Sequence, residues 1–257
     1  MRIEIHLTHH CNLNCKYCSH FSSIADKWEL DPIDFENDLK SIDNNILNSF
    51  DHIKLLGGEP LLNKHINDIL IIARKYFKHK ITILTNGILL SKMPDKFYKI
   101  CKDNNIEITY TKYPIIYDKI KTFIKSLKDK GVNIYQQRNG SIFNYRKYNL
   151  EGNIDPNKSF QNCTKGLINE MNCMQLVGTK LFRCYRIPYI WIFNKKFNQN
   201  LEITKDDYLD LKDVIDSNDI IKYISTPKPF CKYCEPIKVD NNKVDFEISK
   251  KEITEWT

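Results

Sequence analysis

Residues 8–22 read THHCNLNCKYCSHFS and hold three cysteines within eight positions, at a CxxxCxxC spacing. Cysteine thiolate is the usual ligand of each iron in an iron–sulfur cluster, and a cubane cluster has four irons. Cys11, Cys15 and Cys18 can therefore bind three irons of one cluster and leave the fourth iron open. The spacing predicts a metal centre whose open iron binds a small molecule.

Structural zinc and disulfide bonds are the alternatives for these cysteines. Zinc sites need four ligands, usually in pairs spaced CxxC or HxxxH, and His9, His10 or His20 could supply a fourth ligand here. The zinc alternative therefore stays open. A disulfide framework is not expected, because nine cysteines is an odd number and the chain does not begin with an apolar signal segment. We expect a cytoplasmic enzyme with reduced thiols.

The composition limits the class of protein. A chain of 257 residues with 42% hydrophobic residues can bury one large core, or a main domain and a smaller one. It holds no apolar run of about 18 residues, so no membrane partner is expected. The net charge of +7 suits an anionic small-molecule substrate, such as a phosphorylated or nucleotide-linked compound. The lysines are spread along the chain rather than clustered, so no nucleic-acid partner is expected.

Strand-like and helix-like segments alternate through the first part of the chain. Ile3, Ile5 and Leu7 alternate with polar residues, which is the period of a strand, and this strand delivers Cys11 at its carboxyl end. Further strands are predicted at 53–56, 81–84, 106–111 and 132–136, and helices at 31–47, 65–77, 94–104 and 117–130. This order predicts parallel βα units, whose functional residues lie at the carboxyl ends of the strands.

A second motif, GGEP at residues 57–60, directly follows the second predicted strand. Paired glycines allow a backbone to approach a ligand closely, and a carboxylate such as Glu59 can accept a hydrogen bond from an ammonium group. A glycine pair after a strand is more often an ordinary turn. This pair lies one βα unit after the three cysteines, and that position favours a functional role over an ordinary turn.

These features resemble the radical S-adenosylmethionine (SAM) superfamily. The resemblance rests on the CxxxCxxC spacing, on Tyr17 before the third cysteine, on the strand before the first cysteine and on GGEP. It implies a partial (β/α) TIM-type barrel and a 4Fe-4S cluster whose open iron binds SAM. In this family, an electron from the cluster cleaves SAM to a 5′-deoxyadenosyl radical, which abstracts a hydrogen from the substrate. The expected electron donor is a flavodoxin or a ferredoxin.

The resemblance also implies which residues meet SAM. A GGEP-like stretch holds the amino group of SAM, and residues at the ends of the third and fourth strands often meet its ribose or carboxylate. The expected SAM-binding residues are Tyr17, Gly57, Gly58, Glu59, Pro60, Thr85, Asn86, Thr111 and Lys112. For the last four, ordinary loop polarity is the alternative.

A second set of cysteines follows residue 160: Cys163, Cys173, Cys184, Cys231 and Cys234. Residues 174–177 and 180–182 flank Gly178 and Thr179 and predict a β-hairpin with a two-residue turn. In that register Cys173 and Cys184 face one another, with Cβ atoms about 4.5 to 5.5 Å apart. This separation suits two ligands of one cluster.

The second set resembles the twitch domain, a shorter relative of the SPASM domain that carries one auxiliary 4Fe-4S cluster beside a radical SAM barrel. Five cysteines are one more than a single cluster needs, so Cys163 or Cys173 is either a bystander or a substitute ligand. Structural zinc bound by these cysteines stays an alternative.

Four further residues carry expectations. Cys101 lies inside a predicted helix and is expected to be a small core residue. Thr204 and Asp207 resemble a capping box and predict a helix that ends at about residue 215. His20 is expected to hydrogen-bond its own loop, with a place toward the substrate as the alternative.

The predicted domains are a radical SAM partial barrel in residues 1–150 and an auxiliary cluster domain in residues 160–257. This layout is similar to that of the radical SAM dehydrogenase that oxidises an aminocyclitol alcohol. CSHF, at residues 18–21, resembles a group of bacterial radical SAM proteins encoded beside glycosyltransferases.

Three functions follow from these patterns. The first is an oxidoreductase that dehydrogenates a sugar, polyol or nucleotide-linked alcohol, with the auxiliary cluster as electron acceptor. The second is a peptide-modifying enzyme that installs a crosslink or an epimerised centre. The third is a non-enzymatic metal-binding module.

Overall fold

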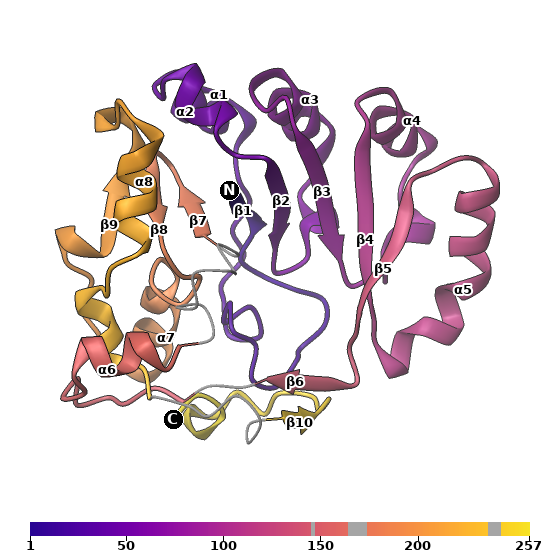
Figure 1. Ribbon diagram of the computed structural model, residues 1–257. Coiled ribbons are helices and arrows are strands. Elements are labelled where there is room, and N and C mark those ends of the chain that lie inside the picture. Colours follow the sequence, from indigo (N-terminus) through magenta and orange to yellow (C-terminus); the bar gives the residue numbers. More distant parts are fainter. Residues whose placement is uncertain (145–146, 164–173, 236–242) are drawn as a thin grey trace.

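The computed structural model describes residues 1–144, 147–163, 174–235 and 243–257. The described residues form a curved sheet of eight strands in the order β5-β4-β3-β2-β1-β7-β8-β9 (Figure 1). The strands predicted in the first part of the chain are present and run parallel: β1 Arg2–Thr8, β2 His52–Gly57, β3 Lys80–Thr85, β4 Ile106–Lys112 and β5 Ile134–Asn139. Their carboxyl ends therefore meet at one edge of the sheet.

Helices lie along the outer side of these five strands (Figure 1). They are α1 Pro32–Lys40, α2 Asn44–Asn48, α3 Ile66–Tyr76, α4 Asp95–Asp103 and α5 Pro114–Asp129. The single helix predicted at 31–47 is wrong, because a second N-cap interrupts it. Asp31 caps α1 by accepting a hydrogen bond from the Ile33 amide at 2.8 Å, and Asp43 caps α2 by accepting one from the Asn45 amide at 2.7 Å.

The central strand β1 is buried on both faces. Ile3, Ile5 and Leu7 pack into the main core, as their alternation predicted. Glu4 and His6 on the opposite face are also buried. Glu4 is compensated by Lys54 Nζ at 3.6 Å and by the side-chain amide of Gln175 at 2.6 Å, so the inner face of the sheet carries paired polar groups.

The predicted hairpin is present and continues the same sheet. β7 Met174–Val177 and β8 Lys180–Phe182 pair antiparallel around Gly178, whose φ of +61° suits a tight turn. The observed pairing of Val177 with Lys180 is the predicted register. β7 also pairs in parallel with β1 on the side opposite β2, which joins the hairpin directly to the strand that precedes the cysteines.

The helix predicted from Thr204 to residue 215 is wrong. The capping box exists, because the Asp207 carboxylate accepts from the Thr204 amide at 2.8 Å, but it closes one 3₁₀ turn, η3 Lys205–Asp207. The chain then pairs with β8 as the edge strand β9 Tyr208–Asp210. The other oxygen of Asp207 accepts from the Phe230 amide at 2.7 Å, so this carboxylate joins two distant segments rather than starting a helix.

The remaining elements complete the fold, and some of them line a second core that is rich in aromatic side chains. They are α6 Pro156–Gln161, α7 Ile190–Phe197, α8 Ser217–Ile224, the 3₁₀ turns η1 Pro60–Leu62, η2 Leu90–Lys92, η4 Leu211–Asp213, η5 Pro229–Tyr233 and η7 Ile253–Glu255, and the strand pair β6 Ile142–Asn144 and β10 Lys243–Asp245. Phe21, Tyr148, Phe193 and Trp256 share this core, so it binds the cysteine loop to the C-terminal end of the chain. Among the described residues no helix has the length and apolarity needed to cross a membrane.

Candidate active site

Cys11, Cys15 and Cys18 lie together in the loop that follows β1. Cys15 and Cys18 both act on Cys11, and Cys18 also acts on Cys15, which places the three sulfurs in one electrostatic group. The Leu13 amide donates to Cys11 Sγ at 3.3 Å, and Tyr113 at the end of β4 hydrogen-bonds the Cys15 side chain. Burial raises the pKa of Cys11 and raises that of Cys15 to about 12, so both thiols release a proton when a metal binds.

These three cysteines fit a cluster by their donor set. Amide and hydroxyl donors to cysteine sulfur are the hydrogen bonds that accompany iron–sulfur clusters. Within the described ranges, no three His, Cys, Asp or Glu side chains are arranged to hold a single metal ion. A four-iron cluster does not require such a group, because each thiolate binds a different iron.

The backbone of this loop is strained at two positions. Tyr17 and Phe21 adopt φ values of 59° and 57°. These values lie in the left-handed region, which residues other than glycine seldom adopt. Such conformations persist where the surrounding structure holds them, and they cluster at functional sites.

The C-terminal segment supplies part of the support for this loop. The Lys16 amide donates to the Glu247 carbonyl at 2.9 Å, and the Ser249 amide donates to the Asn14 carbonyl at 2.8 Å. Lys16 Nζ also forms an ion pair with Glu247 at 2.7 Å. We call residues 246–256 the C-terminal cover. Its role could not be expected from the sequence, because it carries neither a motif nor a clear period.

The GGEP glycines allow two loops to meet. Gly57 has φ +140°, and a Cβ on it would lie 2.2 Å from the Thr8 carbonyl oxygen. A Cβ on Gly58 would lie 1.9 Å from the carbonyl oxygen of His10. The Gly58 amide donates to Thr8 at 2.9 Å and the Glu59 amide donates to His10 at 3.1 Å. The glycines therefore hold the loop after β2 against the cysteine loop, beyond serving as a turn.

Glu59 links the predicted SAM-binding residues to one another. Its carboxylate is fully buried and accepts from Thr85 Oγ1 at 2.6 Å, from the Asn86 amide at 2.8 Å and from the Leu61 amide at 3.1 Å. Burial raises the pKa of Glu59 to about 7 despite these donors. A carboxylate has about four acceptor positions, so one remains after these three bonds. The side-chain amide of Asn86 donates to Cys11 Sγ at 3.6 Å, which connects this network to the cysteine loop.

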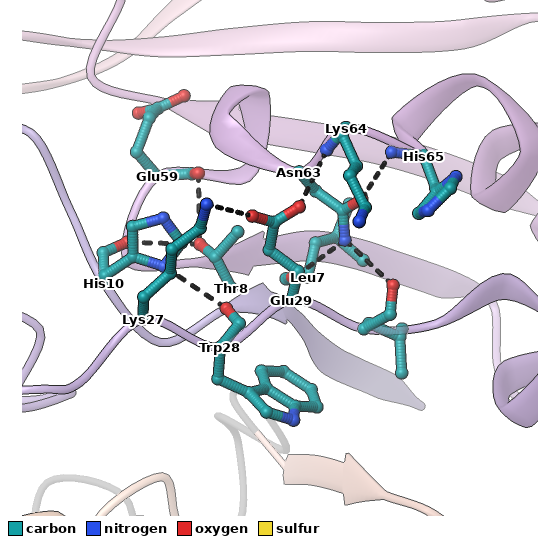
Figure 2. A network of polar contacts seen from close by, with 11 residues as sticks. Leu7, Thr8, His10, Lys27, Trp28, Glu29, Glu59, Asn63, Lys64 and His65 are labelled. Carbon is teal, nitrogen blue, oxygen red and sulfur yellow. Dashed lines mark hydrogen bonds and ion pairs between the residues drawn. The ribbon is translucent and has the colours of Figure 1, made fainter.

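Figure 2 shows how the ends of β1 and β2 are tied to the segment before α1. The side-chain amide of Asn63 donates to the carbonyls of Leu7 at 2.8 Å and Leu30 at 3.0 Å. Thr8 Oγ1 donates to the Glu59 carbonyl at 3.0 Å, and Glu29 accepts from the Lys64 amide at 3.0 Å. Pro60, the last residue of GGEP, is buried as the first residue of η1.

Thr111 and Lys112 end β4, as predicted, but differ in surroundings. Thr111 is buried and accepts from Arg138 Nε at 3.5 Å, whereas Lys112 Nζ lies over the ring of Tyr117 at 4.4 Å. The sequence prediction missed Arg138, whose positive charge also acts on Cys15. The fifth strand was predicted to stop at residue 136, and following it three residues further to Asn139 would have revealed an arginine at the edge that carries the site.

Histidines gather beside the cysteine loop. His6 Nε2 lies 2.7 Å from His20 Nδ1, and the His6 ring stacks on Tyr189 at 3.7 Å between centroids. His20 therefore has a partner on β1. His9 stacks on Trp28 at 4.1 Å. Burial lowers the pKa of His6, and it lowers that of His9 to about 4, so both stay neutral near pH 7.

The second set of cysteines also comes together. Cys163 follows α6, Cys184 lies in the turn between β8 and α7, and Cys231 and Cys234 belong to η5 and its end. Cys184 is influenced by Cys163 and Cys234, and Cys231 by Cys234 and Cys163. Burial raises the pKa of Cys184 to about 12 and that of Cys231 to about 11. Cys173, the fifth member, lies outside the described residues; Cys101 is buried in α4, as expected.

A family model, the Radical SAM superfamily, matches residues 5–137, from β1 into β5. The chain belongs to the radical SAM superfamily. Members of this superfamily bind a 4Fe-4S cluster and SAM, and the fold is the partial TIM-type barrel that the sequence predicted.

Similar proteins support the fold more than the reaction. GTP 3′,8-cyclase of Helicobacter pylori strain 26695 is 34% identical over 94 residues, which are 35% of this chain and 29% of that protein. A probable GTP 3′,8-cyclase of Thermoplasma volcanium is 34% identical over 90 residues, 35% of this chain and 26% of that one. The matches therefore span under a third of these radical SAM relatives. The crystal structure of BtrN in complex with AdoMet and 2-DOIA has a TM-score of 0.53 at 18% identity, over 94% of this chain and 95% of that chain, and shows a shared fold.

Proposed function

We propose that the chain is a radical SAM oxidoreductase that dehydrogenates an alcohol carbon of a sugar, a polyol or a nucleotide-linked compound. The observation that carries this proposal is the second gathering of cysteines, Cys163, Cys184, Cys231 and Cys234. Cys184 follows a hairpin that pairs with β1, and β1 leads into the loop of Cys11, Cys15 and Cys18, so one cysteine of each set lies next to the same sheet. This arrangement supports a radical centre with an electron acceptor in the same protein.

The residues have separate roles in this proposal. Cys11, Cys15 and Cys18 hold the radical cluster, and the second four cysteines hold an auxiliary 4Fe-4S cluster in a twitch-like domain at 160–257, after a barrel at 1–150. The remaining acceptor position of Glu59 suits the SAM ammonium group. The residues expected to surround SAM further are Tyr17, Gly57, Gly58, Pro60, Thr85, Asn86, Thr111 and Lys112, to which the position of Arg138 adds a cation suited to the SAM carboxylate.

The cofactors, when bound, supply a carbon-centred radical for hydrogen abstraction and a one-electron acceptor. An alcohol that loses one hydrogen atom from carbon, one proton from oxygen and one electron becomes a ketone or an aldehyde. The hydrogen atom would go to the 5′-carbon of SAM held near Glu59, and the electron would go to the cluster held by Cys163, Cys184, Cys231 and Cys234. The proton would leave through a base of the site or of the substrate. A flavodoxin or ferredoxin would deliver the starting electron, in the cytoplasm.

The test is an anaerobic assay with SAM, a reductant and a panel of aminocyclitols, hexoses and nucleotide sugars deuterated at their alcohol carbons. The proposal expects one 5′-deoxyadenosine for each ketone or aldehyde, with deuterium moved into 5′-deoxyadenosine. A product isomeric with its substrate and carrying a solvent hydrogen would establish epimerisation instead. Turnover of peptides, with no alcohol oxidised, would favour the peptide-modifying function. Zinc bound by both sets of cysteines would favour the third function, a non-enzymatic metal-binding module.

A further inference from the structure

A buried arginine lies among the second set of cysteines. Arg186 is 5% exposed, and its Nη1 lies 3.4 Å from Cys234 Sγ. Its backbone amide donates to Cys184 Sγ at 3.5 Å. One residue therefore contacts a cysteine from the turn after β8 and a cysteine at the end of η5, two segments far apart in the sequence.

Tyr148 completes this arrangement. The Arg186 guanidinium lies over the Tyr148 ring, 3.6 Å from its centroid. Tyr148 is 3% exposed, and among the described residues its hydroxyl has no hydrogen-bond acceptor. A buried hydroxyl that lacks an acceptor is unfavourable, so this one suits an acceptor held by the neighbouring cysteines.

The charge of Arg186 suits the same acceptor. Its Nη1 donates to the Lys147 carbonyl at 3.4 Å and lies equally close to Cys234 Sγ, so the guanidinium is held against a cysteine sulfur. A buried cation is stable when an anion compensates it. Thiolates that bind a cluster, with its sulfides, supply that anion.

We infer that Arg186 and Tyr148 cap the auxiliary cluster and raise its reduction potential. Reduction adds one negative charge to the cluster, and a nearby cation with a hydroxyl donor stabilises the reduced form more than the oxidised form. The pair would bias this cluster toward accepting an electron, as an alcohol dehydrogenase needs. The inference rests on the proposed function to the extent that these cysteines must hold a cluster.

The test uses the full chain with Cys11, Cys15 and Cys18 replaced by Ala, so that one type of cluster remains. The parent is reconstituted anaerobically with iron and sulfide, and its reduction is followed by electron paramagnetic resonance against solution potential. Arg186→Met should lower the equilibrium constant for reduction at least tenfold, which is about 59 mV for one electron. Arg186→Lys keeps the charge and should stay closer to the parent. Tyr148→Phe should shift the potential in the same direction by a smaller amount.

A matched control and a second readout separate this role from a structural one. Tyr98 is also buried, but its hydroxyl already donates to the Leu90 carbonyl in the barrel, so Tyr98→Phe should leave the potential unchanged. In deuterated buffer, Tyr148→Phe should lose one exchangeable-deuteron coupling from the spin-echo spectrum of the reduced cluster. Should Arg186→Met fail to bind iron, Tyr148→Phe decides the question through both readouts.

The outcomes are distinguishable from failure of the proposed function. A parent that binds zinc or no iron would overturn the auxiliary cluster, and the inference with it. A parent with about four irons, whose potential and deuteron couplings are unchanged by Tyr148→Phe and whose potential is unchanged by Arg186→Met, would overturn the inference alone.

Discussion

The indole nitrogen of Trp256 donates to the backbone carbonyl of Cys18 at 3.0 Å, across 238 positions of sequence. The third cysteine of the loop after β1 is thereby held by the C-terminal cover. The cover is attached elsewhere as well, because the Tyr148 amide donates to the Trp256 carbonyl at 2.6 Å. Trp256 therefore connects the loop of Cys11, Cys15 and Cys18 to the neighbourhood of the second set of cysteines.

Replacing Trp256 by Phe should loosen the cluster loop. The variant keeps an aromatic ring in the second core but leaves the Cys18 carbonyl without its indole donor, which costs about 1 kcal/mol of folding stability. We expect a lower free energy of unfolding and faster loss of the radical cluster in air, measured by its absorbance. Trp191→Phe is the control, because Trp191 is 44% exposed. Equal cluster lifetimes in both variants would contradict this role of the cover.

Replacing Cys11, Cys15 or Cys18 by Ala should abolish reductive cleavage of SAM while iron stays on the second set of cysteines. The physical reason is that the two sets share no ligand. Formation of 5′-deoxyadenosine is measured by chromatography, and iron is measured in the same samples. Continued SAM cleavage by any of the three variants would remove these residues from the cluster.

Replacing Cys231 and Cys234 together by Ala should lower the bound iron from about eight per chain to about four, the difference of one four-iron cluster. SAM cleavage without substrate should persist, because the radical cluster is intact. Metal analysis and Mössbauer spectroscopy follow the change. The control is Cys101→Ala, which removes a cysteine buried in α4 away from both sets. An unchanged iron content in the double variant would contradict the auxiliary cluster.

Replacing Gly58 by Ala should prevent stable docking of the loop after β2. The new Cβ would lie 1.9 Å from the His10 carbonyl oxygen, so backbone must move, at a cost of roughly 3 kcal/mol or more. Gly131→Ala is the matched control, because Gly131 has φ +76° but its Cβ would meet no atom closer than 3.6 Å. We expect that variant to lose about 1 to 2 kcal/mol. Chemical denaturation compares the two, and equal losses would contradict the argument.

His52 should make folding stability depend on pH. Burial, followed by Lys54 and Lys80, lowers its pKa from 6.5 to about 4 in the folded chain. Below pH 6.5 the unfolded chain therefore binds a proton that the folded chain does not, and stability falls as the pH drops. His52 is half-exposed, so we expect a loss of about 1 kcal/mol between pH 7.5 and 5, after discounting for solvent screening. His52→Asn should remove this part of the dependence, and identical pH profiles of unfolding would contradict it.

The sequence predicted those parts of the molecule whose signals are local. The alternation of Ile3, Ile5 and Leu7 sufficed for β1, and the predicted hairpin has the predicted register. Pairing between distant segments left no such signal. The sequence near β1 does not show that β7 pairs with it, and the sequence near Lys16 does not show that Glu247 lies beside it. The false helix after Thr204 shows the same limit, because a correct local cap was overridden by pairing between Leu209 and Leu181.

Site residues followed the same division. The cysteine triplet and GGEP could be recognised from the sequence by their spacing. The structure places Glu59, Thr85 and Asn86 in one hydrogen-bond network. The sequence did not predict a role for Arg186 or Tyr148. An arginine two positions after a cysteine is common, and only the fold brings Cys234 close to it. The contributions of Tyr113 and Arg138 near Cys15 likewise arise from the ends of strands that meet through the sheet.

The C-terminal cover sets an order of events during synthesis. Glu247 leaves the ribosome 231 residues after Lys16, its partner in the cluster loop. At 5–20 residues per second, the loop is made roughly 10 to 50 s before its cover exists. During that interval its thiols are open to whatever delivers iron and sulfide to the growing chain. Once residues 246–256 dock, the contacts of Glu247, Ser249 and Trp256 hold this loop, so any later opening of the loop must break them.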